Sequence, residues 1–436
     1  AQVRMGQDYT FRFQEDNGRP TGAASLGVAP AGFVNGEYRQ DATRIRETNY
    51  DFIIGANQEF GAFGVDLTRG GNQMYRGIER NRQLATDFVV RDLYTLQNAR
   101  VVNSSYDIIE RKVNSIYGAA EINYKAWLYL NATLRNDWFS TLAPELRSIN
   151  YPSLTGSFVF SQAFQNLPGW LYFGKIRAAY AEVGSDTDVA PYSNNLFFGT
   201  NANLYNGKSI GSISGDRIPS STLSPMRVKE WEFGLETKLF DNRVGLEISI
   251  YDKVTEDQIL QVLSSNTSGY TSKLQNVGKS RNNGVEMLLS LTPVQTSNLQ
   301  WNVSFNAAFN ESEVLDLGEG VNEIVLSQGE VRGQLWHVLG APLGQLRGIG
   351  YLRDDAGNII HDSNNGNYLT TPEYIALGQA IPRWVGGIFN SVNFKGITLS
   401  VLVDFKLGHD LFSTTNFNAW RHGLHKGSLV GRETGL

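Results

Sequence analysis

The 436-residue sequence contains no cysteine, so it can form neither a disulfide nor a thiol-ligated metal site. It also has no long apolar run, because the longest stretch of consecutive hydrophobic residues covers only 126–130. A membrane-spanning helix needs roughly 20 such residues, so the chain does not cross a membrane as helices. The first residues, AQVRMGQDYT, lack the charged and apolar regions of a secretory signal.

The sequence also has no large excess of charge of one sign. The sequence has 38 Lys and Arg against 43 Asp and Glu, a net charge of −5, and no basic stripe. Nucleic acid and acidic membrane surfaces are therefore poor candidates for partners. The chain is too long for one ordinary compact core, but its length is ordinary for a large β-barrel.

Stretches that alternate between apolar and polar residues recur along the sequence. In LQWNVSFNAAFN, residues 299–310, the odd-numbered residues are apolar and nearly all the even-numbered ones are polar. Successive side chains of a strand point to opposite faces, so this stretch predicts a strand with one apolar and one polar face. The same alternation occurs at 127–137, 231–240, 243–251, 282–292 and 396–406.

Short turns and long polar connections alternate between these strands. The short turns lie at 125–126, 241–242, 293–298 and 395–396, and the long connections at 69–111, 138–150, 185–227, 252–280 and 311–383. We expect about a dozen strands of about ten residues between 49 and 407, and a thirteenth near 3–13. The pattern is typical of an all-β, transmembrane antiparallel β-barrel with short periplasmic turns and long extracellular loops. A soluble β-sandwich is the alternative, but its strands are usually shorter and its loops are similar at both ends.

Seven stretches in order carry a family resemblance: VNSIYGAAEINYKAWLYLNATLRNDWFSTL, YPSLTGSFVFSQAF, FGKIRAAYAEVGSDT, VKEWEFGLETKLFDNRVGLEISIYDKVTEDQI, NVGKSRNNGVEMLLSLTPV, APLGQLRGIGYLRDDAGNII and LGQAIPRWVGG. Across about 49–410 they resemble the SusC/RagA-like TonB-dependent outer-membrane transporters of Bacteroidetes. Such barrels have about 22 strands around a plugged lumen. Neither a plug domain nor a TonB-contacting segment is visible here. Residues 1–436 are therefore expected to be a C-terminal portion of one barrel, with 12–13 of its strands.

The resemblance implies a function and partners. It implies a TonB-dependent active importer of oligosaccharides or oligopeptides in the outer membrane of a Gram-negative bacterium. A SusD-like surface lipoprotein would form a lid over loops 185–227 and 311–383, and a dimer of transporter–lipoprotein pairs stays open. No cofactor and no enzyme activity are expected. A passive porin-like outer-membrane channel and a soluble β-rich adhesin or glycan-binding protein are the alternatives.

No catalytic or metal-binding constellation stands out in the sequence. His422 and His425 are three residues apart, but no third ligand accompanies them, so incidental surface histidines are the favoured interpretation. The Asp- and Asn-rich segment 353–367 lacks the spacing of a calcium-binding helix-loop-helix site. It is better explained as a cluster of turns, although calcium binding there stays open.

Two groups of residues are candidates for contact with a transported substrate. The first shares the polar strand faces that would line the barrel interior, and the second consists of loop aromatics that could stack on sugar rings or grip peptides. The alternative is that the charges keep the wall hydrated or pair with a plug, and that each aromatic pins its own loop. The candidates are Arg135, Asp137, Glu232, Glu236, Glu247, Asp404 and Lys406 from the strands, and Tyr192, Tyr205, Trp336 and Tyr351 from the loops.

Overall fold

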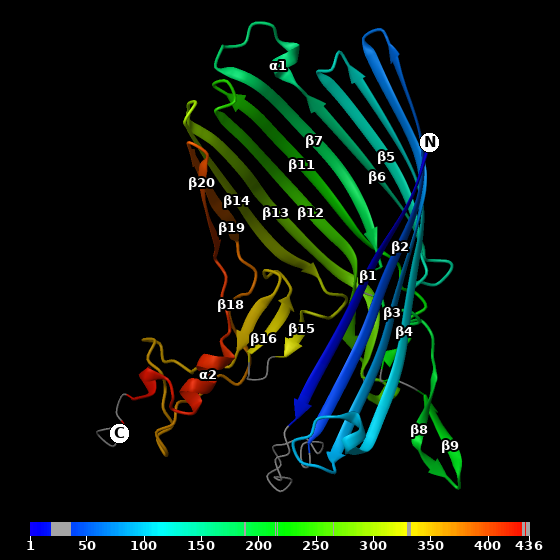
Figure 1. The fold of residues 1–436 in the computed structure, drawn as a ribbon. Coiled ribbons are helices and arrows are strands. Elements are labelled where there is room, and N and C mark those ends of the chain that lie inside the picture. Colours follow the sequence, from blue (N-terminus) through cyan, green and yellow to red (C-terminus); the bar gives the residue numbers. More distant parts are fainter. Residues whose placement is uncertain are drawn as a thin grey trace.

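One large curved sheet dominates the computed structural model, which describes residues 1–18, 36–186, 189–213, 215, 217–264, 266–328, 333–429 and 432. The antiparallel strand order is β1-β2-β3-β4-β5-β6-β7-β11-β12-β13-β14-β19-β20, and β10 pairs in parallel with β13. Figure 1 shows this sheet as an open half-barrel. Its edge strands, β1 and β20, have no second partner among the described strands.

The strands vary greatly in length. Those of the large sheet are β1 (Gln2–Gly18), β2 (Glu37–Phe60), β3 (Phe63–Phe88), β4 (Ala99–Tyr124), β5 (Leu128–Phe139), β6 (Ser148–Phe158), β7 (Leu171–Ser185), β10 (Arg217–Ile218), β11 (Met226–Leu239), β12 (Val244–Leu263), β13 (Ser272–Gln295), β14 (Leu299–Asp316), β19 (Trp384–Phe394) and β20 (Ile397–Leu407). The predicted thirteenth strand near 3–13 is confirmed as β1. The first of the dozen was predicted to begin at 49, which was wrong, because β2 begins at Glu37.

The connections at one end of the sheet carry structure of their own. They hold a hairpin, β8 (Phe198–Tyr205) and β9 (Lys208–Ile213), and a small sheet of β15 (Glu323–Gln328), β16 (Gly333–Val338), β17 (Gln345–Gly348) and β18 (Ile375–Gln379). The helices are short: α1 (Phe160–Ala163), α2 (Thr414–Arg421) and the 3-10 turns η3 (Leu96–Asn98), η4 (Asn266–Ser268) and η5 (Lys426–Leu429). In the part of the chain described, no helix is both long and apolar enough to cross a membrane.

The two faces of the large sheet have opposite chemistry, as the alternation predicts. Opposed residues of paired strands point to the same face, so the register can be followed from strand to strand. Leu289, Phe305, Ile388 and Val403 are direct partners in this way and form an apolar row on the outer, convex face. Polar residues form the matching rows on the inner, concave face.

The apolar outer face is not covered by a second layer. Leu130 is 48% exposed and Trp301 is 38% exposed, while Phe305 and Ile248 are partly exposed. The two packed layers of a soluble β-sandwich would have buried all four. The outer face therefore requires an apolar surrounding, which a lipid bilayer provides.

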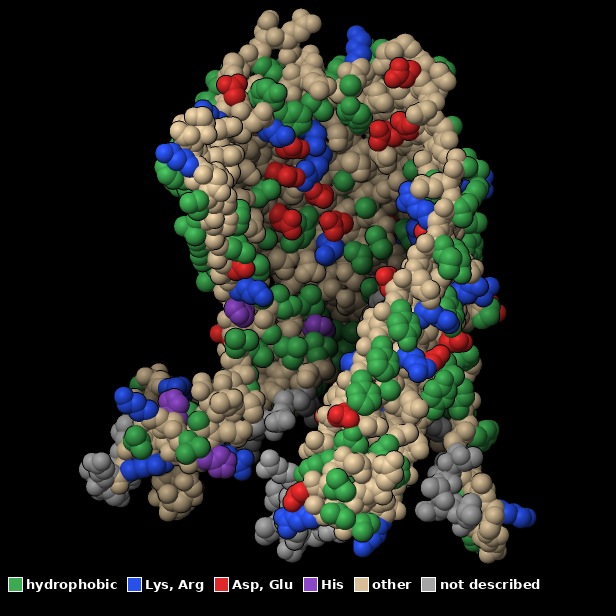
Figure 2. Space-filling view, in the orientation of Figure 1, with side chains coloured by type: hydrophobic (Ala, Val, Ile, Leu, Met, Phe, Trp, Pro, Cys, Tyr) green, Lys and Arg blue, Asp and Glu red, His purple; other side chains and the backbone are tan. Residues whose placement is uncertain are grey.

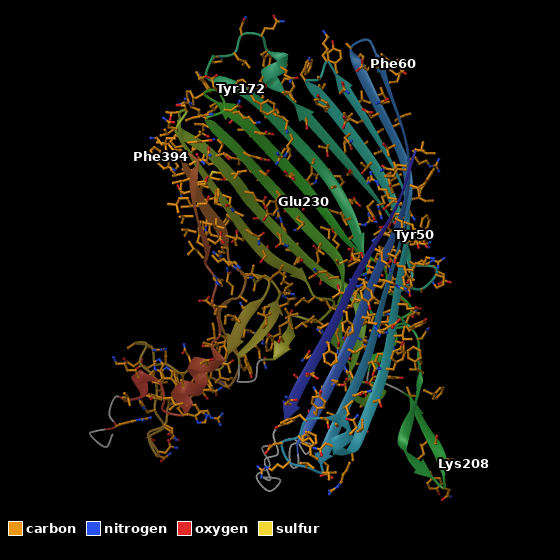
Figure 3. The ribbon with its side chains drawn as sticks, in the orientation of Figure 1. Tyr50, Phe60, Tyr172, Lys208, Glu230 and Phe394 are labelled. Carbon is orange, nitrogen blue, oxygen red and sulfur yellow. The ribbon has the colours of Figure 1, made fainter. Side chains whose placement is uncertain are left out.

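Aromatic rings mark both borders of the apolar band. At the short-turn end, ring centroids 4.8–5.9 Å apart form a chain of Phe63, Tyr124, Trp127, Phe158 and Phe164. Figure 3 labels Phe60, Tyr172 and Phe394 along the same end. At the other border the pairs are Tyr180 with Trp231 and Phe309 with Trp384. Two such girdles flank the lipid-facing band of transmembrane barrels.

The short turns lie where they were predicted. Lys125 and Ala126 both have positive φ, 48° and 57°, as do Asp241 and Asn242, at 56° and 66°. Positive φ at both central residues characterises the tight hairpin turns whose twist matches that of the flanking strands. The predicted turn at 395–396 is confirmed as well, and the one at 293–298 is shorter, since β13 ends at Gln295.

Two of the five predicted long loops are wrong over most of their length. Strands β3 and β4 continue through most of 69–111, and β12 and β13 through most of 252–280. Beyond the lipid band both faces of a strand meet water, so the sequence turns polar while the strand persists. Polar contacts across strands stabilise these extensions, for example Tyr75 with Glu110 at 2.6 Å and Arg281 with Asp252 at 2.7 Å. Segment 311–383 is confirmed as a long connection from its seventh residue on, since β14 ends at Asp316 and β19 begins at Trp384, and it holds the small sheet.

Candidate functional site

Charged side chains gather on the concave wall of the half-barrel (Figure 2). Arg177 on β7 pairs with Glu232 at 3.1 Å and Glu247 at 2.8 Å. It also donates a hydrogen bond of 2.6 Å to the Ser249 hydroxyl. Next to this group, Lys175 pairs with Glu236 at 2.8 Å. The three predicted glutamates therefore lie on the concave wall as expected, and basic neighbours already pair with each of them.

A cavity of about 480 Å³ lies on the same wall. Glu230, Glu286 and Tyr251 line it together with the Arg177 group, and Figure 3 labels Glu230 there. The Tyr251 hydroxyl donates a 2.9 Å hydrogen bond to Asn310 and covers Gly284, where a Cβ would lie 2.6 Å from that hydroxyl. Only glycine leaves room for this tyrosine to lie along the wall.

The cavity lining is acidic. Four carboxylates line it, those of Glu230, Glu232, Glu247 and Glu286. The guanidinium of Arg177 is the one basic group among these lining residues, so the net charge of the lining is 1 − 4 = −3. Arg177, Glu230, Tyr251 and Glu286 were not among the residues predicted from the sequence to contact a substrate. Strand parity carried the signal for all four, since each has the parity of the inward-facing residues of its strand. What it did not show was which strands would bring them together.

Arg135 and Asp137 form a second polar group, further along the wall. Arg135 Nε donates to Asp137 at 2.8 Å, and its Nη2 donates to the Ser115 hydroxyl at 2.7 Å. The Tyr151 hydroxyl also donates to Asp137, whose residue is only 5% exposed. The enclosed carboxylate accepts hydrogen bonds from Arg135 and Tyr151 and so holds both side chains in place. This geometry favours a structural role for Asp137.

A buried ion pair ties the connections at the long-loop end to the wall. Asp186, which follows β7, accepts hydrogen bonds from Arg111 on β4 and from the Thr141 hydroxyl in the β5–β6 connection. Burial raises the pKa of the Asp186 carboxyl, and the two hydrogen bonds oppose that rise. Around it lies an apolar cluster of Val113, Phe139, Leu142, Ile149, Tyr151, Val189, Leu223, Ile259 and Leu274. We call this arrangement the Asp186 clamp.

The remaining predicted residues are scattered. Asp404 and Lys406 lie on the edge strand β20, on the concave side by register. Tyr205 is 70% exposed at the tip of the β8–β9 hairpin, and Tyr192 packs edge-on against Phe197. The structure does not bring these four to the acidic cavity.

The other two predicted aromatics belong to the small-sheet region. Trp336 on β16 lies under the guanidinium of Arg347 at 4.9 Å and donates to Gln334 at 2.9 Å. The Tyr351 ring packs against Tyr368, with centroids 5.2 Å apart. Both aromatics therefore have local partners, and their contact with a substrate stays a prediction.

The residues weighed as possible metal ligands have other contacts in the structure. Across the described residues, no three His, Cys, Asp or Glu side chains form a group able to hold a metal ion. Asp354 accepts from the backbone and side-chain amides of Asn358, and these hydrogen bonds hold the pKa of its carboxyl below the usual range. The segment is thus a turn cluster. The His425 ring stacks on Trp420, with centroids 4.6 Å apart.

His337 on β16 makes the small sheet sensitive to pH. Burial lowers the pKa of its imidazole, and the backbone N–H of Gly344 points at its Nδ1 from 3.5 Å. The unfolded chain therefore binds a proton more readily than the folded sheet. The stabilising contribution is complete above the ordinary histidine pKa of about 6.5 and is lost as the pH falls through that value.

We accordingly expect amide hydrogen exchange in residues 333–348 to accelerate on acidification. At pH 5.5, one unit below the ordinary histidine pKa, exchange corrected for intrinsic rates should rise by up to about tenfold. The His337→Gln variant, which cannot titrate there, serves as the control. An equal acceleration in that variant would show that another group senses the pH.

The fold and the wall define a class of protein. A sheet with an apolar, girdled outer face and a hydrated, charged concave wall belongs to a membrane-spanning β-barrel that surrounds an aqueous interior. Residues 1–423 match the family described as TonB dependent receptor-like, beta-barrel, and the chain belongs to this family. The membrane that it spans is therefore the outer membrane.

Named relatives agree with this placement. The chain is 26% identical to TonB-dependent receptor P26 of Formosa agariphila, over 73% of this chain and 34% of that protein. It is 22% identical to TonB-dependent receptor SusC of Bacteroides thetaiotaomicron, over 72% and 33%. A solved structure, that of the RagAB peptide transporter, matches with a TM-score of 0.75 and 21% identity, over 93% of this chain and 45% of that one. The chain thus spans less than half the length of these relatives.

Proposed function

We propose that the chain is part of an active nutrient importer of the outer membrane. The single observation that carries this is the half-barrel itself, in which thirteen consecutively paired strands separate a lipid-facing from a hydrated, charged face. Further strands would pair with the edges of β1 and β20, since a sheet in hydrocarbon must leave no edge unpaired. About 22 strands would enclose a lumen wide enough to need a plug.

The proposed cargo is an oligosaccharide or an oligopeptide. Related proteins are described as SusC and as a peptide transporter, which supports both classes. Charged side chains on the wall, above all the group around Arg177, would keep a polar solute in a hydrated path. The importer would break no covalent bond in its cargo, so no enzyme activity and no cofactor are proposed.

The proposed partners act at opposite ends of the barrel. A SusD-like surface lipoprotein would close over the long-loop end, where the β8–β9 hairpin and the small sheet β15–β18 offer structured contact surfaces. TonB would act from the periplasmic end through a plug domain and use the inner-membrane proton gradient. Pairs of transporter and lipoprotein would form the assembly, singly or as a dimer.

Uptake by cells tests this proposal. Cells that carry the complete transporter should accumulate labelled cargo, and deletion of TonB should reduce uptake at least about a hundredfold, because no open path remains past a plug. Cells with TonB but without the transporter give the background. Uptake that persists without TonB would contradict active import and point to a passive channel.

A further inference from the structure

A charged side chain lies on the outer face of the sheet within the lipid band. The outward Leu130 shares one row with Ile122 and Val65, so the odd-numbered residues of this part of β3 face outward, Arg69 among them. Arg69 is exposed and lies six residues from the short-turn end of its strand (69 − 63), whereas the border aromatic Phe309 lies ten residues from the end of its own (309 − 299). Arg69 is therefore placed below the long-loop border of the band, where hydrocarbon meets the sheet.

No acidic side chain accompanies Arg69 on this face. Three rows of outward residues on β2, β3 and β4 surround it, and none of their other members is charged. These members are Ala56, Leu67 and Ala120, then Ile54 and Gly118, then Phe52, Gly71 and Ile116. Arg44, further along the outer face, pairs with Glu79 at 3.7 Å, but Arg69 forms no ion pair among the described residues. Its positive charge is therefore uncompensated by the described part of the chain.

The position of Arg69 calls for an anionic partner from outside the chain. An unpaired charge on the lipid face destabilises a barrel, and charged residues at membrane depth nearly always have a partner. The planar guanidinium offers five donors in a fork that fits the oxygens of a phosphate or a carboxylate. The outward residues that the described strands place between the two aromatic borders include no carboxylate, and Asp252, at the border itself, is held by Arg281. A second copy would thus offer no free carboxylate, and a lipid phosphate is the anion that the membrane supplies.

A gap leads from Arg69 toward the long-loop border. Gly71 is the next outward residue of β3, and a Cβ there would meet only a backbone oxygen, at 3.3 Å, and no side chain within 4 Å. The outward residue after it, Gln73, donates a 2.9 Å hydrogen bond to Asn114, and its register partner on β2 is Tyr50, which Figure 3 labels. Two amides and a phenol hydroxyl therefore lie in one row at the end of this gap.

We propose that Arg69 binds the phosphate of an outer-leaflet lipid, which enters through the gap over Gly71. Arg69 and Gln73 are four residues apart, about 13 Å of strand, and a long arginine side chain can extend along part of that distance toward the border. The guanidinium would donate to the phosphate from below, while the amides of Gln73 and Asn114 would contact the headgroup at the border. The site lies outside the barrel, so it does not depend on the proposed cargo or partners.

The outer face beyond the border does not repel a phosphate. On β2, β3 and β4 it carries three basic residues against two acidic ones, by the same register. These are Arg44, Arg46 and Lys112 against Glu79 and Glu110. An anionic headgroup that approaches Arg69 from the long-loop side therefore meets no excess of negative charge.

Lipid binding to the complete transporter tests the assignment. Delipidated protein in detergent is titrated with phosphatidylglycerol or with digalactosyldiacylglycerol of identical acyl chains, which has no phosphate, and bound lipid is counted by native mass spectrometry. The tightest site should prefer phosphatidylglycerol at least about tenfold, as a hydrogen bond to a charged group is worth that factor. Arg69→Gln should remove this preference. Arg44→Gln, which removes the same charge from the same face beyond the border, should keep it.

Unfolding of the complete protein in liposomes gives a second readout. In liposomes of the galactolipid, Arg69→Leu should raise the ratio of folded to unfolded protein about tenfold, because it removes an unpaired charge from the lipid face. In liposomes of phosphatidylglycerol it should not raise this ratio, because the phosphate that compensated the charge is lost as a partner.

Four outcomes would overturn the proposal. They are equal binding of the two lipids, a preference that survives Arg69→Gln, a preference that Arg44→Gln abolishes as well, and equal stabilisation by Arg69→Leu in both kinds of liposome. Displacement of the lipid by inorganic phosphate would overturn it in favour of the free ion. If Arg69→Gln dissociated a protein complex and left the lipid preference unchanged, the anion would be a carboxylate of a partner protein.

Discussion

Leu130→Arg is expected to lower the free energy of unfolding by about 1–3 kcal/mol, the cost of a charge on the lipid face between the interface and the bilayer centre. Leu130 points outward on β5 and is half exposed, with the girdles on either side of it. Its neighbour Asn131 points inward, where Glu121 lies directly opposite on β4. Asn131→Arg should therefore change stability by less than about 0.5 kcal/mol.

The comparison of these two adjacent positions isolates the environment of each face. Urea unfolding of the complete protein reconstituted in liposomes, followed by tryptophan fluorescence, gives both free energies. Leu130→Ala separates lost apolar contact from added charge, and its cost should be clearly smaller than that of the arginine. If Asn131→Arg were the more costly change, the assignment of lipid and water to the two faces would be reversed.

The alternation of apolar and polar residues along the strands was predictable, because a bilayer favours an apolar side chain at each outward-facing position. A polar residue on the outer face costs free energy wherever hydrocarbon meets it, so residues such as Phe233 and Glu232 must alternate strictly within the lipid band. This constraint is local in sequence, and it was enough to predict the approximate number of strands in the large sheet and four of its short turns, although the turn at 61–62 was not predicted.

Beyond the lipid band this constraint no longer applies, and the strand boundaries predicted from the sequence were less accurate there. Residues 69–111 lack a sustained alternation and are rich in polar residues, which resembles a loop in composition, yet β3 and β4 remain paired over most of the segment. The strands persist because neighbouring strands continue beside them and satisfy their backbone hydrogen bonds. Nothing in the composition of the segment itself shows that a neighbouring strand pairs with it.

The groups on the concave wall were predictable one by one but not together. Glu232 and Glu247 had the right parity, but Arg177, which joins them, lies 55 and 70 residues away in the chain. Likewise, 75 residues separate Arg111 from Asp186. Such pairings depend on strand order and register, which a single sequence does not give.

Asp186→Ala is expected to release the long-loop end of the wall and to lower its local stability by about 3 kcal/mol. The substitution removes the shared acceptor of Arg111 and Thr141, and Thr141 is itself buried. A buried donor without a partner costs roughly 1–3 kcal/mol, and a charged one costs more. Because the Arg111 side chain stays 22% exposed, water offsets part of that cost, which places the estimate at the lower end for a broken buried pair.

Hydrogen exchange would show this release at residues 138–147, 189–195 and 217–224, which lie in the connections that the Asp186 clamp joins to β4. Protection there should fall by about a hundredfold, since every 1.4 kcal/mol is a factor of ten. Asp186→Asn keeps an acceptor for Thr141 and should lose less. Arg100→Ala, which breaks the exposed pair with Asp87, should change protection little, as surface pairs contribute about 0–1 kcal/mol. If Asp186→Ala left these segments as protected as Arg100→Ala does, the apolar cluster alone would hold the loops, and the buried ion pair would be dispensable.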